Sequence, residues 1–134
     1  MKRFLILIIA VCSLAACKKD GSPVSANIIG KWELHERRGG NIIPQDTIYQ
    51  AGNGNILQFY ADSTYKQYTN GTLSAQGVFH IIINGYRSGT DVYDELYFDN
   101  DVYFDYLISI SGNSLILKPL MPDIGTTAYV RITN

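Results

Sequence analysis

The chain has 134 residues, about one domain, and its 11 basic and 12 acidic side chains give a formal net charge of −1. This balance excludes a generic nucleic-acid binder, which would carry a surplus or a stripe of basic residues. Hydrophobic residues make up 46% of the chain, which excludes a disordered polymer and suffices for a packed core. With 12 Gly, 4 Pro and 10 Tyr, the composition favours strands and turns over helices.

The first sixteen residues have the pattern of an export signal. Lys2 and Arg3 precede an apolar run over residues 4–16, which is too short to span a bilayer but has the length of a secretory h-region. The run ends in Leu-Ala-Ala directly before Cys17. This order resembles the signal peptide and lipobox of bacterial lipoproteins. The resemblance implies cleavage after residue 16 and acyl chains on Cys17, which attach the mature protein to a membrane.

The same resemblance implies a location in the cell envelope. In lipoproteins an Asp directly after the lipidated Cys retains the protein in the inner membrane, and this chain has Lys18 there. We therefore expect the outer membrane, at its periplasmic face or at the cell surface. Residues 17–27 are polar and include Gly and Pro, so we expect a flexible tether. Loss of two basic residues with the leader takes the net charge from −1 to −3, and attachment then depends on the acyl chains.

Residues 28–134 are predicted to form one all-β domain. They lack a helical period, and their apolar residues alternate or form short β-branched and aromatic blocks bounded by turns. Eight consecutive strands with short links favour a single up-and-down antiparallel β-barrel. The predicted strands are 28–37, 55–61, 64–69, 72–83, 92–98, 102–111, 114–118 and 126–133, with a further short strand within 42–49.

Three turns predict how neighbouring strands pair, because residues directly opposite each other share a face of the sheet. The turns lie at 70–71, 99–101 and 112–113. The expected pairs are Tyr68 with Leu73, Leu96 with Phe104, Glu95 with Asp105, and Ile108 with Leu117. In the first strand, alternation is expected to point Trp32 and Leu34 inward and Lys31, Glu33, His35 and Arg37 toward water.

The two ends of this domain resemble lipocalins. Gly30-Lys31-Trp32 matches the G-x-W pattern of the first lipocalin strand, and Arg131 lies in the last predicted strand. In that family an Arg near the end of the barrel packs over the Trp. The resemblance, which extends over most of 28–132 and includes the small lipocalin-like domains of Bacteroidetes lipoproteins, implies that Gly30, Trp32 and Arg131 close the barrel. A guanidinium on an indole contributes about 0.5–2 kcal/mol.

The interior of such a barrel is the first candidate binding site. A small eight-stranded barrel either fills its interior with side chains or leaves room for one small ligand. Glu36 and Arg38, near the far end of the first strand, are expected at the mouth, where they would orient an amphipathic guest. The residues expected to line the interior are Phe59, Tyr68, Phe79, Phe104 and Tyr106.

The outer face is the second candidate. It is either a solvated surface with Asp and Asn as turn formers, or a patch for a protein partner, because Tyr is enriched in interfaces. The segment 99–105 also has the start of a calcium loop, but it lacks the Gly and the Glu that complete one. The residues of this candidate partner patch are Tyr93, Glu95, Tyr97, Tyr103 and Asp105.

Catalysis finds no support in the sequence. The expected mature chain has no free Cys, the chain has no G-x-S-x-G motif, and His35 and His80 lack a metal-binding partner at close spacing. We therefore expect no catalytic residue, no metal and no cofactor. The sequence predicts a lipid-anchored envelope protein whose lipocalin-like barrel binds a small apolar or amphipathic ligand. The alternative is a structural or protein-interaction module with a solid core, such as an accessory to an outer-membrane complex or an inhibitor.

Overall fold

The computed structural model describes residues 24–42, 44–100, 104–121 and 123–133. The predicted leader, Cys17 and Tyr103 lie outside the described residues. Within them, the last residues of the predicted tether form one short helix, α1 (Val24–Asn27). None of the described helices has the length and apolar character that crossing a membrane requires. The described strands are β1 (Gly30–Arg38), β2 (Thr47–Ile48), β3 (Ile56–Phe59), β4 (Thr64–Thr69), β5 (Thr72–Ser88), β6 (Asp91–Phe98), β7 (Tyr106–Ser111), β8 (Ser114–Pro119) and β9 (Thr126–Ile132).

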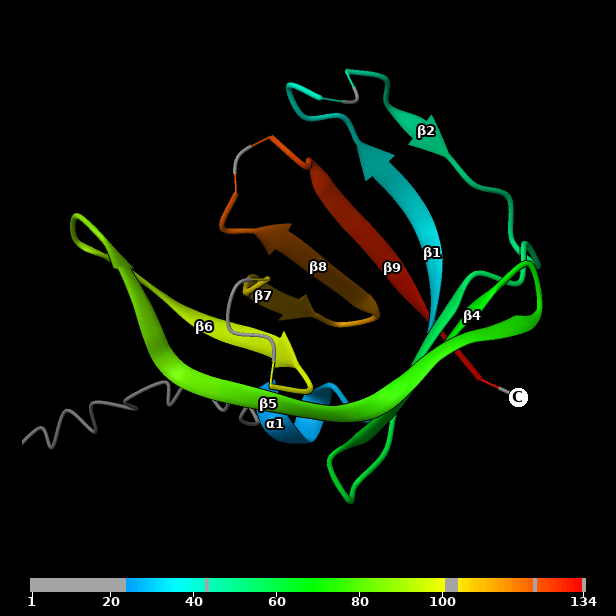
Figure 1. Ribbon diagram of the computed structural model, residues 1–134, viewed down its shortest axis with the longest axis horizontal. Coiled ribbons are helices and arrows are strands. Elements are labelled where there is room, and N and C mark those ends of the chain that lie inside the picture. The colour runs from blue at the N-terminus through cyan, green and yellow to red at the C-terminus, as the bar shows by residue number, and fades with distance from the viewer. Residues whose placement is uncertain (1–23, 43, 101–103, 122, 134) are drawn as a thin grey trace, which may run out of the picture.

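The strands form a closed antiparallel barrel, which confirms the predicted fold class (Figure 1). Eight strands, β1 and β3–β9, each pair with the next, and β9 pairs back onto β1. Closure removes the free edges of the sheet, which would otherwise be open to pairing with other chains. The extra strand β2 pairs with Glu36 and Arg37 of β1. These residues lie beyond Glu33, the last residue of β1 that pairs with β3.

The core lies in the part of the barrel nearest α1. Ile28, directly after the helix, is fully buried, and Val24 and Ile29 pack against the same cluster. Aromatic rings fill much of the space, with Phe59 and Phe79 in an edge-to-face contact at 4.9 Å between centroids. This end of the barrel is therefore closed and solid. Its buried side chains are Ile28, Trp32, Leu57, Phe59, Tyr65, Phe79, Leu96, Ile108, Leu115 and Leu117.

The first and last strands meet through Trp32 and Arg131, which are directly paired in the register of β1 and β9. Arg131 Cζ lies 4.1 Å from the centroid of the Trp32 ring, so the contact implied by the lipocalin resemblance is present. The guanidinium also donates hydrogen bonds to the carbonyls of Ile29 (2.8 Å) and Asn27. Gly30 has a φ of +132°, and a Cβ there would lie 2.8 Å from Arg131 Nη1. Only glycine fits this position without strain.

Two of the three predicted registers are observed. Ile108 pairs with Leu117 across the two-residue turn, and Tyr68 pairs with Leu73. The register of β6 and β7 is different: Leu96 pairs with Tyr106 instead of Phe104, and Glu95 pairs with Leu107 instead of Asp105. The connection runs from 99 to 105 and is longer than a three-residue turn. Because the shift is two residues, the faces of both strands stay as predicted.

Bulges change which side chains face inward in two strands. Between β4 and β5, Tyr68 pairs with Leu73 but Gln67 pairs with Ala75, so Ser74 is an extra residue. Phe79 therefore shares its face with Gln67 and not, as a regular strand would require, with Tyr68. Between β1 and β9, the register shifts between Leu34 and Glu36. The side chains of β1 after this bulge consequently exchange faces.

Strand β5 continues to Ser88, five residues beyond its predicted end, and pairs with β6 to its tip. The last pair between β6 and β7 is Asp94 with Ile108, so the hairpin beyond it leaves the barrel wall. We call residues 83–93 the β5–β6 arm, which projects from the barrel at the left of Figure 1.

Candidate functional site: the open end of the barrel

The end of the barrel opposite α1 contains two neighbouring cavities of about 280 Å³ and about 230 Å³. They share Arg37, Leu57, Gln67 and Tyr129, so together they form one hollow region, which we call the open-end cavity. The larger part is completed by Leu34, Tyr49, Asn55, Ile56, Tyr68, Thr69 and Asn70. The smaller part is completed by Phe98, Tyr106, Leu117, Pro119, Ile124, Gly125 and Thr127.

The bulge in β1 decides which charged residue faces this cavity. After the bulge, Glu36 pairs with Ala128 and Arg37 with Thr127, and Thr127 lines the cavity. Arg37, expected to point to water, is therefore the residue at the mouth. Glu36 and Arg38, expected there, lie on the outer side of the strand. One extra residue in β1 is the physical reason for this correction.

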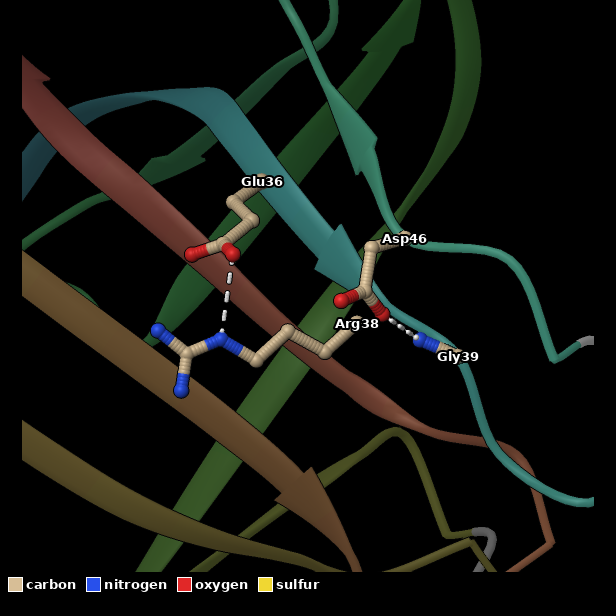
Figure 2. Close-up of polar contacts among 4 residues, drawn as sticks. All are labelled: Glu36, Arg38, Gly39 and Asp46. Carbon is tan, nitrogen blue, oxygen red and sulfur yellow. Dashed lines mark hydrogen bonds and ion pairs between the residues drawn. The ribbon is translucent and has the colours of Figure 1, made fainter.

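Glu36 and Arg38 interact with each other on the outside of β1 (Figure 2). Arg38 Nε donates to Glu36 Oε1 at 3.1 Å, and the Arg38 side chain is largely exposed. The neighbouring Gly39 N–H donates to Asp46 Oδ1 at 2.9 Å, which ties the end of β1 to the segment before β2. Neither Glu36 nor Arg38 lines the open-end cavity.

Tyr129 brings a neutral phenol to the cavity. Burial raises the pKa of its hydroxyl above the ordinary value, while a hydrogen bond with Thr127 and the charge of Arg37 act in the opposite direction. The side chain therefore stays protonated at neutral pH and can donate a hydrogen bond. Tyr129 lies two residues before Arg131 in β9, so strand alternation places both on the inner face.

The predicted interior residues divide between core and cavity. Phe59 and Phe79 belong to the solid core, and Phe104 is 50% exposed, precedes β7 and lines neither cavity. Tyr68 lines the larger part of the cavity and Tyr106 the smaller part. Sequence reasoning missed Arg37, Tyr49, Gln67 and Tyr129. The alternation around Arg131 could have found Tyr129, whereas the bulges hid Arg37 and Gln67.

Glu33 positions one wall of the cavity. It was expected to face water, but it is 8% exposed because the β2–β3 connection folds over it. Its carboxylate accepts hydrogen bonds from the N–H groups of Gly52 (3.0 Å) and Gly54 (3.4 Å). The same connection carries Tyr49 and Asn55 to the cavity.

The β5–β6 arm forms an outer groove with β7 and β8. Tyr86 and Tyr93 come from the arm, with ring centroids 6.3 Å apart. They face Leu107, Ile116 and other residues across a space of about 330 Å³ whose surface is mainly apolar. We call this space the outer groove; its remaining lining residues are Ser88, Ile108, Ser109, Lys118, Pro119 and Leu120.

Three residues of the predicted partner patch, Tyr93, Glu95 and Tyr97, alternate along β6 and therefore share one face of that strand. Tyr93 lies in the outer groove, Tyr97 stacks on His80 at 4.7 Å between ring centroids, and Tyr103 is outside the described residues. Burial, and secondarily the charge of Asp105, raises the pKa of Glu95, so these two carboxyl groups remain near each other despite the changed register.

The acidic segment after β6 has a structural role in the described residues. The Asp99 carboxylate accepts hydrogen bonds from the Tyr65 hydroxyl (3.1 Å) and the Val78 N–H (3.0 Å). No group of three or more His, Cys, Asp or Glu side chains with metal-binding geometry occurs in the part of the chain that the structure describes.

No family model, curated protein or solved structure matches this chain.

Proposed function

We propose that the protein is a lipid-anchored component of the cell envelope whose lipocalin-like barrel binds a small amphipathic molecule without catalysis. The open-end cavity is the observation that carries this proposal. It lies at one end of a barrel whose other end is solid, and its lining combines aromatic and aliphatic side chains with several polar groups. Cavities of this kind, concave and largely preformed, are typical of small-molecule sites.

The chemistry of the lining favours binding over reaction. None of the described residues that line the cavity is an Asp, Glu, His or Cys. A general base or a nucleophile with an adjacent base would require at least one of these types in most enzymes. Arg37, Gln67 and Tyr129 can instead donate hydrogen bonds to a polar group of a bound molecule.

The membrane anchor is proposed from the leader. The basic start, the apolar run of residues 4–16 and the small residues before Cys17 support lipidation of that cysteine. Several acyl chains on one residue would hold the protein on a membrane stably, because each buried methylene contributes about 0.8 kcal/mol. The chain would enter the domain at α1, the closed end of the barrel, and the cavity lies at the other end.

Native mass spectrometry of the protein, extracted from its host in mild detergent, tests both parts. We expect a chain that begins at Cys17 and carries acyl groups, and a non-covalent adduct that dissociates on activation. The variant Gln67→Trp fills the cavity and should lose the adduct but keep the acyl groups. Gln76→Trp, on the exposed outer face of β5, is the matched control and should keep both. A wild-type protein without adduct would contradict ligand binding, and an unmodified Cys17 would contradict the anchor.

A second function, docking of a protein partner, is favoured by the outer groove. Tyrosine and aliphatic side chains line it, and Tyr93 is 38% exposed. Tyrosine is enriched in protein interfaces relative to the rest of the surface. If a partner is captured from envelope extracts, Tyr93→Ser should weaken its binding, whereas Tyr60→Ser, on a turn away from the groove, should not. Equal binding by both variants would exclude the groove as the docking surface.

A further inference from the structure

The open-end cavity has a positive charge, and the described residues that line it include no carboxylate to compensate it. Arg37 belongs to both parts of the cavity, and no Asp or Glu is among the described residues that line them. Arg38, its neighbour, is paired with Glu36 on the outside of β1, whereas Arg37 makes no ion pair with the described residues. An anionic ligand could pair with this exposed guanidinium, and carboxylates match its planar fork in two parallel hydrogen bonds.

Two uncharged donors accompany Arg37. The Tyr129 hydroxyl remains protonated at neutral pH, and the Gln67 side chain carries an amide NH₂ group. A carboxylate has two oxygens and about four acceptor positions, so it can accept from the guanidinium and from these neighbours at the same time. The lining thus provides several donors and one full positive charge, with no competing negative charge from the described residues.

The dimensions of the cavity limit the rest of the ligand. Its two parts measure about 280 Å³ and about 230 Å³, each equal to the volume of roughly eight or nine liquid waters. Below them the barrel is filled, since Phe59 is 1% exposed and Leu115 is fully buried. A long acyl chain therefore has no channel to enter. The rings of Tyr49, Phe98 and Tyr106 favour a compact aromatic body instead.

We propose that the open-end cavity binds a small aromatic monocarboxylate, with the carboxylate held by Arg37 and the ring among the tyrosines. This inference rests on the proposed ligand-binding function and names the chemical class of the ligand. It requires a charged, short ligand in place of a neutral or long-chain lipid.

Calorimetric titration of the full acylated chain in nanodiscs tests the inference, with empty nanodiscs subtracted. The probes are 3-phenylpropanoate, its neutral amide 3-phenylpropanamide, and hexadecanoate. We expect 3-phenylpropanoate to bind at least about tenfold more tightly than the amide, which corresponds to 1.4 kcal/mol. Hexadecanoate should bind more weakly than 3-phenylpropanoate, because its chain cannot enter the filled core.

Substitutions of the two neighbouring arginines test which positive charge causes the preference for the carboxylate over the amide. Arg37→Gln should remove the preference for the carboxylate over the amide, and Arg38→Gln should keep it. Gln67→Glu places a negative charge beside Arg37 and should also remove the preference, which gives a second test if one variant is poorly folded. Circular dichroism and thermal unfolding check the fold of each variant.

The outcomes separate this inference from the proposed function. Equal affinity for the carboxylate and the amide, an unchanged preference in Arg37→Gln, or tighter binding of hexadecanoate would each overturn the inference. A ligand found by native mass spectrometry with no binding of 3-phenylpropanoate would also overturn it and leave the binding function intact. No adduct and no probe binding together would reject both.

Discussion

The guanidinium of Arg131 covers the indole ring of Trp32 at 4.1 Å, and the same group donates hydrogen bonds to the carbonyls of Asn27 and Ile29. Trp32 in turn donates from Nε1 to the carbonyl of Ile28 at 2.6 Å. One cation therefore joins the first strand, the last strand and the segment after α1. This arrangement closes the barrel and also covers its solid end.

Removal of this cation should destabilise the fold. Arg131→Ala loses the contact with Trp32 and leaves two backbone carbonyls without their donors, and we expect a loss of about 3 kcal/mol in the free energy of unfolding. Urea unfolding measures it. Arg87→Ala on the exposed β5–β6 arm is the control and should stay within about 0.5 kcal/mol of wild type. Equal stability of the two variants would show that Arg131 does not close the barrel.

Gly30→Ala should be more destabilising than Gly71→Ala, although both glycines have a positive φ. At Gly30 the new Cβ would lie 2.8 Å from Arg131 Nη1, whereas at Gly71, with φ +80°, nothing lies within 4 Å. Both variants carry the backbone cost, about 1 kcal/mol for Gly71→Ala, and only Gly30→Ala adds the displacement of Arg131. We expect about 3 kcal/mol for Gly30→Ala by urea unfolding. Similar losses for both would mean that the backbone alone requires this glycine.

The sequence predicts the barrel well and the cavity poorly, for a physical reason. The two-residue turn at 112–113 and the alternation of β7 and β8 are local signals, so the pair Ile108 and Leu117 follows from them. The length of the connection after Phe98 is not a local signal, and the predicted pairing of β6 with β7 was wrong by two residues.

Bulges have a larger consequence than a shifted register. The bulge between Leu34 and Glu36 has no glycine or proline to mark it, yet it moves Arg37 to the mouth and Glu36 to the outside. The packing of β1 against β2 and β9 fixes this geometry, and sequence alternation alone cannot reveal it. The inward position of Tyr129, in contrast, could be predicted from the sequence, because Tyr129 lies two residues before Arg131 in the same strand.

The carboxylate of Glu33 should hold the β2–β3 connection in place. Glu33→Gln keeps the shape but removes the charge that accepts from Gly52 and Gly54, and we expect a loss of about 1–2 kcal/mol in stability. Hydrogen exchange of these two amides should accelerate. Glu36→Gln, in an exposed pair, should leave both the exchange and the stability nearly unchanged. Unchanged exchange in Glu33→Gln would argue against the role of this carboxylate.

Stability should depend on pH through Glu95. Its pKa in the folded protein is raised above the ordinary value of 4.5, first by burial and then by Asp105. A raised carboxyl pKa contributes stability that is full below 4.5 and is lost as the pH rises through the folded value. Glu95→Gln should therefore gain stability relative to wild type as the pH rises above 4.5, as followed by urea unfolding.

The pH dependence of stability expected from Asp62 is opposite to that expected from Glu95. Hydrogen bonds from the Thr64 hydroxyl and N–H lower the pKa of Asp62 below 3.8, so its contribution is present above this pH and is lost as the pH falls. Asp62→Asn should lose stability relative to wild type as the pH rises from acid. The same pH trend in both variants would contradict these assignments.

A crystal structure of the protein with 3-phenylpropanoate locates the ligand and thereby tests whether Arg37 binds its carboxylate. We expect density for the carboxylate against Arg37 and Tyr129, with the ring between Tyr49 and Tyr106. Density confined to the outer groove between the β5–β6 arm and β7–β8, or an open-end cavity without ligand at saturating concentration, would contradict it.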